Sequence, residues 1–215
     1  MQKLIDLAHI RSTTRKIRGI VKKTPLQESL IYSQKYNSKI FFKREDLQDV
    51  KSFKIRGAYT KILSIKKTRA QNGLVCASAG NHAQGFAVSC SLLDYNGTVF
   101  MPHSTPSLKV SLVKEFGGKN IKIKLVGENF SKAYKAAMDY CISNGKTFIH
   151  PFDDIKVIEG QATLFLEVIK QVKNPIDYIF IPIGGGGLIS GAINIFKQLS
   201  PKTKIIGIEP AGAPS

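Results

Sequence analysis

The feature that most constrains the fold of this chain is a regular alternation of short apolar segments with longer helical segments, which begins at residue 74. The pattern predicts strands over residues 74–77, 98–101, 121–126 and 147–149, separated by helices over residues 83–94, 107–116 and 130–143. Short apolar strands joined through helices are typical of a parallel sheet that is covered on both faces and connected by right-handed crossovers. The sequence therefore predicts an α/β protein.

The same alternation continues after residue 150 and is weaker before residue 66. We expect helices over residues 155–172 and 188–199 and strands over residues 177–183 and 204–208. In the N-terminal part, we expect a helix over residues 27–36, a strand over residues 39–42 and a helix over residues 53–65, with Ser52 as its N-cap. These segments form a second α/β unit beside the first.

Length and composition limit the class of protein. A chain of 215 residues with 43% hydrophobic residues can bury the core of one large or two small domains. It has no run of eighteen apolar residues, and charged residues interrupt its first segment, so we expect neither a membrane span nor a secretory signal, and a cytoplasmic location. The three cysteines form no C-x-x-C pair, which favours reduced buried thiols over disulfides or a metal site.

The formal net charge of +17 raises the question of nucleic-acid binding. The lysines are spread along the whole chain, however, and no nucleic-acid-binding motif accompanies them. Charge alone affects solubility and nonspecific association, so we expect no nucleic-acid partner.

One lysine stands in unusual surroundings. Lys54 lies in the segment SFKIRGA, residues 52–58, where it follows Phe53 and precedes Ile55. A lysine held among apolar and small residues has a lowered pKa, and its neutral amine forms Schiff bases with aldehydes and ketones. At the start of a helix, the positive end of the helix dipole also disfavours the ammonium form. Lys54 is therefore a candidate catalytic residue, although most lysines in a chain as basic as this one are simply solvated.

The loop SAGNHAQG, residues 78–85, joins a predicted strand to a predicted helix. Parallel α/β sheets bind ligands at the carboxyl ends of their strands, and small residues that open a helix present free backbone N–H groups to an anion such as a carboxylate. The alternative is that Asn81 caps the helix while His82 packs beside it. The residues alone leave both interpretations open.

Four consecutive glycines, residues 184–187, occupy a similar junction before Leu188. Ordering four glycines is costly, so they indicate an anion, most simply a phosphate, that approaches the backbone closely. A dinucleotide site is the alternative, but no G-x-G-x-x-G can be read here because residue 189 is Ile. No Walker A lysine follows either, which argues against a nucleoside triphosphatase.

A reactive lysine, a carboxylate loop and a phosphate loop together match pyridoxal phosphate, which carries an aldehyde and a phosphate, and an amino-acid substrate. The three segments resemble motifs of the fold-type II pyridoxal-phosphate enzymes, and of the threonine dehydratases among them, with which the chain can be matched from about residue 24 to its end. The resemblance implies two three-layer parallel-sheet domains of tryptophan-synthase-beta-like architecture. It divides the chain into a large domain in two parts, residues 1–65 and 151–215, and a small domain, residues 66–150.

The resemblance also implies a role for each site residue. Lys54 would be the catalytic residue and would carry the cofactor as a Schiff base, and Asn81 would hydrogen-bond the ring hydroxyl of the cofactor. The residues implied to bind the substrate carboxylate are Ser78, Ala79, Gly80, Asn81 and His82. The residues implied to bind pyridoxal phosphate are Lys54, Phe53, Asn81, Gly184, Gly185, Gly186, Gly187 and Leu188, and no metal is implied. Related racemases have a serine in place of Ala79, and alanine cannot donate a proton, which favours elimination.

The activity implied is a lyase reaction that converts L-threonine to 2-oxobutanoate and ammonia, the first step of isoleucine biosynthesis. Catabolic serine or threonine dehydratases share these motifs, and an inactive chain remains a third interpretation. In the family the large domain continues beyond the strand that matches residues 204–208, and complete members form homo-oligomers. Without that continuation we expect an incomplete large domain with an unpaired sheet edge and an apolar face, as in a fragment, the product of a disrupted gene or one half of a split enzyme.

Overall fold

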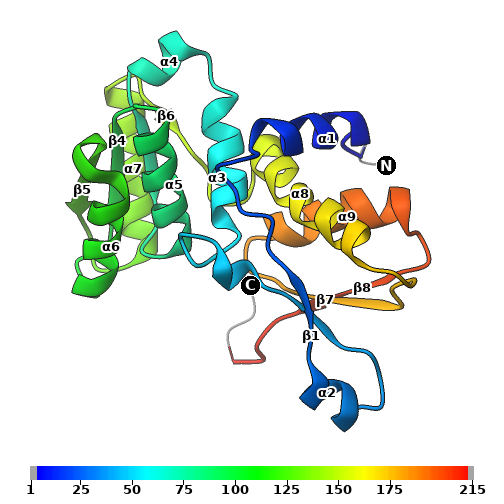
Figure 1. The fold of residues 1–215 in the computed structure, drawn as a ribbon. Coiled ribbons are helices and arrows are strands. Elements are labelled where there is room, and N and C mark those ends of the chain that lie inside the picture. Colours follow the sequence, from blue (N-terminus) through cyan, green and yellow to red (C-terminus); the bar gives the residue numbers. More distant parts are fainter. Residues whose placement is uncertain (1–3, 213–215) are drawn as a thin grey trace.

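The computed structural model describes residues 4–212, which form two α/β units side by side with a helix between them (Figure 1). The first unit is built on a parallel sheet with the strand order β5-β4-β3-β6. Its strands are β3 (Leu74–Ala77), β4 (Gly97–Met101), β5 (Ile121–Leu125) and β6 (Thr147–Phe148). The predicted alternation of strands and helices after residue 74 is therefore confirmed.

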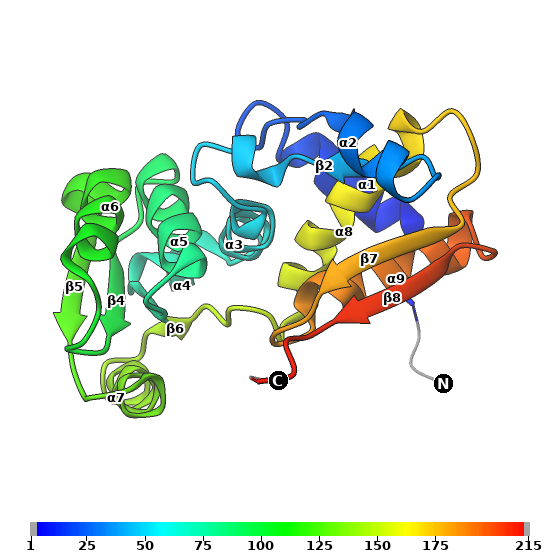
Figure 2. The ribbon, with the colours of Figure 1, turned by 90° about the horizontal axis from the view of Figure 1, so that it is seen from below.

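Helices cover both faces of this sheet. Figure 2 shows α5 (Asn81–Leu92) and α6 (Ser107–Gly117) on one face and α7 (Phe130–Ser143) on the other. All residues of β3 and β4 are buried, and Phe86 of α5 is fully buried against them. The unit also contains the short helix α4 (Lys67–Gln71) and the 3₁₀ helix η2 (Gly118–Asn120), which were not predicted.

The second unit contains a two-stranded parallel sheet, β7 (Tyr178–Pro182) and β8 (Lys204–Ile208). The helices α8 (Ile155–Gln171) and α9 (Gly187–Leu199) pack on one face of it, and α1 (Leu7–Lys16) packs on α8 (Figures 1 and 2). On the other face, Tyr178 and Phe180 are 52% and 64% exposed. The elements predicted after residue 150 are confirmed, and so is an apolar surface on this sheet.

The N-terminal part departs from the prediction. Residues Leu26–Glu28 form a strand, β1, which pairs antiparallel with β2 (Phe41–Lys43), and the helix between them, α2, covers only Leu30–Lys35. The predicted helix over residues 27–36 was wrong at its start because the pairing with β2 claims those residues. Ser29 then caps α2, its side chain accepting a hydrogen bond from the backbone of Tyr32.

The helix α3 (Lys54–Leu63) lies between the two units, against α5 on one side and α8 on the other. Three glycines permit this close packing. A Cβ atom at Gly85 of α5 would lie 3.1 Å from the carbonyl carbon of Lys54, and one at Gly160 of α8 would lie 2.4 Å from the carbonyl oxygen of Arg56. A Cβ at Gly57 would meet the side chain of Gln161 at 2.4 Å. The first turn of α3 is thus fixed by close backbone contacts on both sides, at Lys54 toward α5 and at Arg56 toward α8.

The predicted N-cap of α3 was wrong. The helix begins after Phe53, whose backbone is already in the helical region, and no side chain caps it. The Ser52 hydroxyl is buried and has no hydrogen-bond partner in the described structure.

A buried charge network anchors α3 to its surroundings. The fully buried guanidinium of Arg56 donates to both carboxylate oxygens of Glu45, in the 3₁₀ helix η1 (Glu45–Leu47), and to both of Glu167 in α8, at 2.8 to 3.0 Å. Lys43 donates to Glu167 at 2.6 Å. Burial opposes the charge of Arg56, but its hydrogen bonds with Glu45 and Glu167 outweigh this, and its pKa is raised. Two cations thus meet two anions, as a buried charge requires.

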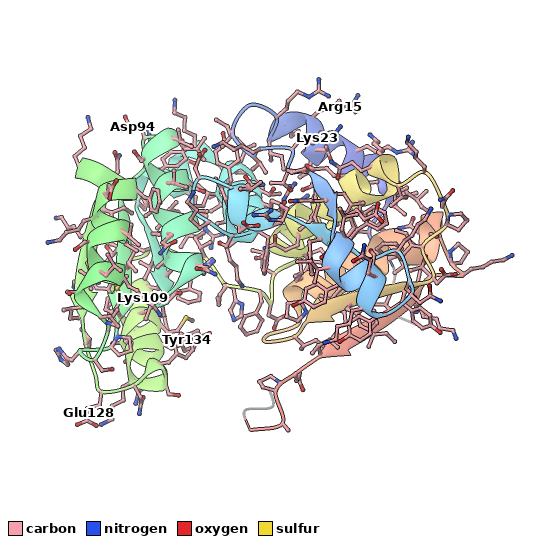
Figure 3. The ribbon with its side chains drawn as sticks, turned by 60° about the horizontal axis from the view of Figure 1, so that its bottom comes forward. Arg15, Lys23, Asp94, Lys109, Glu128 and Tyr134 are labelled. Carbon is pink, nitrogen blue, oxygen red and sulfur yellow. The ribbon has the colours of Figure 1, made fainter. Side chains whose placement is uncertain are left out.

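Three further expectations concern the chain as a whole. No helix in the part of the chain that is described is long and apolar enough to cross a membrane. The three cysteines are buried and free, as predicted, and burial raises the pKa of the Cys76 thiol. Cationic side chains are dispersed: Arg15 in α1 and Lys109 in α6, for example, lie in different units (Figure 3).

Candidate active site

Lys54 is the first residue of α3, and its side chain is half-buried. Its Nζ atom donates a hydrogen bond to the carbonyl oxygen of Pro151 at 2.9 Å and lies 5.4 Å from the centre of the Phe53 ring. Among residues 4–212, no carboxylate lies within ion-pair distance of this amine, and burial lowers its pKa. The predicted setting of a partly desolvated lysine at a helix start is what the structure has.

The loop after β3 contains the predicted substrate-binding residues. The Ser78 hydroxyl accepts a hydrogen bond from the backbone N–H of Gly80 at 3.2 Å, which holds the loop in a tight turn. Gly80 occupies the N-cap position of α5, and Asn81 is the first residue of the helix, with an exposed side chain. Asn81 is therefore not the cap, and since no side chain caps α5, the first backbone N–H groups of the helix are open to an anion.

His82 is buried within the fold. Its Nε2 atom lies 3.0 Å from the carbonyl oxygen of Ile149, and since that oxygen can only accept, Nε2 carries the proton. Burial, with the nearby charge of Lys54 as a smaller contribution, lowers the pKa of His82 to about 3. The imidazole is neutral at physiological pH, so the interpretation that His82 packs beside the helix is confirmed, and its side chain cannot supply a charge to a substrate carboxylate.

The four glycines before α9 are required for different reasons, namely close packing at two of them and open space or a positive φ angle at the others. A Cβ at Gly185 would lie 2.2 Å from the ring of Phe152, and one at Gly187 would lie 2.9 Å from the carbonyl oxygen of Phe152. Gly186 has a φ angle of +78°, which disfavours other residues, and it caps α9 without a side-chain hydrogen bond. A Cβ at Gly184 or at Gly186 would meet nothing within 4 Å. Packing thus explains two glycines, and the other two face open space.

One segment that the sequence analysis missed connects these parts. After β6, the chain passes through Ile149, whose carbonyl receives His82, and Pro151, whose carbonyl receives Lys54. Phe152 follows and lies against Gly185 and Gly187. The segment 149–152 therefore brings the lysine, the loop after β3 and the glycine loop to one place. Two of its contacts are made by backbone carbonyls, which no residue type reveals, so the sequence offered little to find it.

His150 lies within this segment. Its Nδ1 atom accepts backbone hydrogen bonds from Phe152 and Asp153 at 3.3 and 2.7 Å, so its proton is on Nε2. Its ring packs edge-on against Phe152, with 4.7 Å between the centroids. Burial lowers the pKa of His150, which Asp153 partly opposes.

The comparisons with known proteins agree with this arrangement. Residues 17–215 match the protein family described as "Pyridoxal-phosphate dependent enzyme". The chain belongs to this family. It is 49% identical to the biosynthetic L-threonine dehydratase IlvA of Staphylococcus saprophyticus over 214 residues, which are 98% of this chain and 50% of that protein. The chain spans about half the length of the curated relatives that it matches first.

Two solved structures of the family show the same fold. The processed form of threonine deaminase isoform 2 from Solanum lycopersicum has a TM-score of 0.89 and 37% identity, over 99% of this chain and 59% of that one. Maize serine racemase has a TM-score of 0.91 and 33% identity, over 98% of this chain and 63% of that one. The fold-type II architecture predicted from the sequence is thereby confirmed.

The residues present fit the cofactor of the family. Lys54 offers an amine with a lowered pKa and no carboxylate partner in the described chain, as covalent binding of an aldehyde requires. The uncapped start of α9 and the open space beside Gly184 and Gly186 suit a phosphate, and the uncapped start of α5 suits a second anion. The described residues contain no group of acidic, histidine or cysteine side chains that could hold a metal ion.

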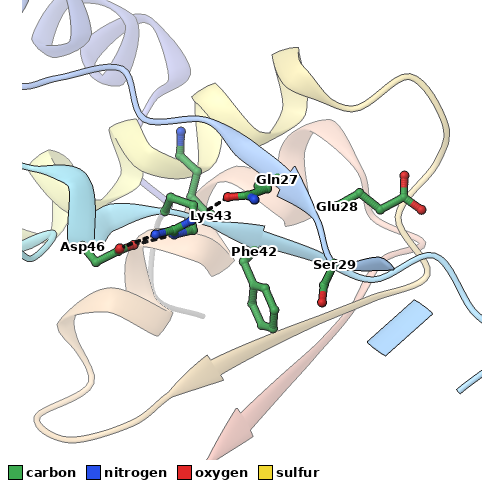
Figure 4. A pocket seen from close by; sticks show the side chains of 7 residues that line it. Gln27, Glu28, Ser29, Phe42, Lys43 and Asp46 are labelled. Atoms are coloured by element: carbon green, nitrogen blue, oxygen red, sulfur yellow. Dashed lines mark hydrogen bonds and ion pairs between the residues drawn. The ribbon is translucent and has the colours of Figure 1, made fainter. Parts of the chain in front are cut away.

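A cavity also lies away from these residues. It has a volume of about 350 Å³ and is formed along β1 and β2, where the Arg44 guanidinium pairs with Asp46 and donates to Gln27 (Figure 4). None of the predicted site residues lines it. Since these side chains already satisfy one another, we assign it no role.

Proposed function

We propose that this chain carries the cofactor-binding lysine and the substrate-carboxylate loop of a pyridoxal-phosphate-dependent threonine dehydratase, which converts L-threonine to 2-oxobutanoate and ammonia. The observation that carries the proposal is the setting of the Lys54 amine, which is partly desolvated and donates a hydrogen bond to the carbonyl of Pro151. The next residue, Phe152, packs against the glycine loop. The similarity to relatives named as biosynthetic threonine dehydratases supports the substrate and a role in isoleucine synthesis.

The proposed division of labour follows the geometry. The backbone N–H groups at the start of α9, from Gly184 to Leu188, hold the phosphate of the cofactor, and those at the start of α5 hold the substrate carboxylate. Phe53, whose ring lies beside the Lys54 amine, shields it from water, and Asn81 extends its exposed side chain to a polar group of the cofactor. His82 positions the loop through Ile149 and does not itself bind the carboxylate by charge.

Bound pyridoxal phosphate supplies an electron sink for the electrons left on the substrate Cα when its proton is removed. Lys54 is the residue that removes this proton, because burial lowers the pKa of its amine and so increases the neutral fraction, which can accept a proton. Ala79 offers no proton on the opposite side of the substrate, which favours loss of the β-hydroxyl over return of a proton to Cα. Maize serine racemase has a similar fold, so replacing Ala79 with serine tests whether this position favours elimination over racemisation.

The units of the structure support the proposed domain division. Residues 66–150 contain the four-stranded sheet, while the flanking parts contribute β1, β2, β7 and β8 to the remainder. The exposed Tyr178 and Phe180 favour a second candidate, that the 215-residue chain is inactive until another polypeptide covers them. Association of the whole protein into homo-oligomers belongs to the same proposal.

The proposal is tested by the visible absorption of the purified chain with pyridoxal phosphate, before and after reduction with borohydride, beside a Lys54→Ala variant. We expect a Schiff-base band in the native chain that borohydride fixes on Lys54 and that the variant lacks. Rates of keto-acid release from threonine and from serine then distinguish a biosynthetic from a catabolic dehydratase. A folded chain that forms no such band would show that the second candidate is right.

A further inference from the structure

A second cavity lies in the first unit, at the end of the four-stranded sheet where the strands begin, whereas the candidate active site lies at the end where they finish. It is lined by residues where β4, β5 and β6 begin, whereas the loop of residues 78–80 follows the carboxyl end of β3. Its volume is about 210 Å³. Pockets for drug-sized ligands measure roughly 300–1,000 Å³, so this cavity suits a smaller molecule. The side chains used in the argument are those of Thr98, Lys119, Asn120, Lys122, Tyr140 and Lys146.

The cavity is strongly cationic. Lys119, Lys122 and Lys146 line it, and none of them has a carboxylate within ion-pair distance in the part of the chain that the structure describes. Lys146 donates to the backbone carbonyl of Asn72 at 3.0 Å, which leaves its charge uncompensated. The carboxylate of Asp94 accepts a hydrogen bond at 3.0 Å from Asn120, a lining residue, and forms no ion pair with these lysines in the described structure.

A fourth ammonium group adds to this charge. Lys122 and Lys124 are two residues apart on β5, so their side chains leave the same face of the sheet, the face covered by α7. The Nζ atom of Lys124 lies 3.9 Å from the centre of the Tyr140 ring, and that of Lys146 lies 5.7 Å from it. Two cations thus share one aromatic ring. Such contacts offset part of the cost of desolvation but supply no negative charge.

We propose that this cavity binds a small multivalent anion of the phosphate class, at a site separate from the glycine loop. Like charges gathered around one cavity repel one another, and an anion that bridges them removes this repulsion. Lysine ammonium groups bind phosphate as point charges, and Asn120 and Thr98 add polar groups at the wall. The chemistry of the cavity is therefore matched to a ligand with at least two negative charges.

The test uses pyrophosphate as the probe, titrated into the full chain at constant ionic strength in a calorimeter. We expect saturable binding that becomes at least tenfold weaker in the double variant Lys119→Gln, Lys122→Gln. Both side chains are exposed, so the variant is expected to fold. The matched control, Lys109→Gln with Lys135→Gln, removes the same charge from exposed positions of the same unit and should leave the affinity unchanged. Equal weakening in both double variants, or no saturable binding, would overturn the proposal.

A second readout locates the ligand on the native chain. Amine-reactive labelling followed by mass spectrometry should show that pyrophosphate protects Lys119, Lys122 and Lys146 severalfold, with Lys109 and Lys135 unchanged. Binding of the probe at the glycine loop would instead protect Lys54, and binding there alone would overturn the proposal. The result is independent of whether the chain turns over threonine.

Discussion

The two parallel sheets in the described residues are built from similar strands, but helices cover them to different degrees. The sheet β5-β4-β3-β6 has helices on both faces, and its central strands are wholly buried. The sheet β7-β8 has helices on one face only, and Phe180 on β7 is 64% exposed. A parallel sheet normally has both faces covered. Within the described residues, only the sheet β5-β4-β3-β6 is covered in this way.

The difference between the two sheets indicates which parts of the fold hold the residues of the candidate site in place. Lys54 begins a helix that lies against Gly85 of the completed unit and Gly160 of the other unit. Its amine hydrogen-bonds the segment that leaves β6, whereas the glycine loop follows β7. Lys54 and the loop after β3 are therefore held by the four-stranded unit, whereas the glycine loop follows β7 and packs on Phe152 of the segment after β6.

The largest effect should come from truncating one aromatic residue that packs on the four-stranded sheet and, for comparison, one on β7. Phe86→Ala should lower the free energy of unfolding by about 3–5 kcal/mol, since Phe86 is fully buried and its loss leaves a cavity. Phe180→Ala should change it by less than about 0.5 kcal/mol, because its ring is exposed. Urea unfolding of the two variants measures the difference. Comparable losses in both would show that the face of β7-β8 is covered in solution.

The fold was largely predictable because the completed sheet follows local rules. Its strands are short apolar runs with helices between them, and each could be read from residues next to one another in the chain. The strand Leu26–Glu28 could not be read in this way. Its conformation comes from pairing with Phe41–Lys43, a contact distant in sequence, which overrides the helical spacing of the residues that follow.

The sequence predicted which residue types form the candidate site, but it did not predict the contacts that hold them together. The sequence predicted the setting of Lys54 at a helix start and a glycine loop before a helix over residues 188–199. The reason for Gly185 and Gly187 was not, because it lies in the ring and carbonyl of Phe152, which come from another segment. Likewise, the partner of Lys54 is the carbonyl of Pro151, and every residue has a carbonyl.

A second prediction concerns the pH dependence of the completed unit. The pKa of His82 is about 3 in the folded chain and 6.5 in the absence of structure, so the unfolded state binds one proton more between these values. The free energy of unfolding should therefore fall by about 1.4 kcal/mol per pH unit as the pH drops below 6.5, on account of this residue alone. His82→Gln, which keeps an N–H donor for Ile149, should lose this contribution.

The measurement is urea unfolding of the native chain and of His82→Gln at pH 7 and at pH 4.5. The difference between the two proteins should change by roughly 3 kcal/mol over this range, by the linkage of protonation to unfolding. Carboxylates titrate in both proteins and cancel in the comparison. An identical pH dependence in both would mean that His82 is accessible to protons in the folded state.

A third prediction tests whether the completed unit sets the position of the lysine. Gly85→Ala should destabilise the chain by about 1–3 kcal/mol, because the new methyl group would meet the backbone of Lys54 and Ile55 at 3.1 Å. It should also reduce the yield of borohydride-fixed pyridoxal phosphate on Lys54. The control is Gly97→Ala, whose methyl group would meet only side chains, of Ile121 and Phe86. Reduced labelling in both variants would point to general loosening of the fold.

The smallest effects should come from the caps of two helices, one beside each sheet. Asn129 caps α7, and its side chain accepts a hydrogen bond from the backbone of Lys132 at 3.0 Å. Its replacement by alanine should cost about 1 kcal/mol. Asp154 caps α8 and also pairs with Lys61 of α3 at 2.6 Å, with both side chains largely buried. Asp154→Ala should therefore cost more, and Asp154→Asn, which keeps the cap without the charge, should recover part of the loss.

Unfolding of the three cap variants in urea separates the two contributions. If Asp154→Ala and Asn129→Ala lost the same free energy, the pair between Asp154 and Lys61 would add nothing to the cap. A larger loss at Asp154 that asparagine partly restores would show that the start of α8 is tied to α3 by charge as well as by packing. The ion pair between Asp154 and Lys61 lies three residues from Pro151, whose carbonyl accepts the hydrogen bond from Lys54. It would therefore also help to hold the Lys54 amine in position.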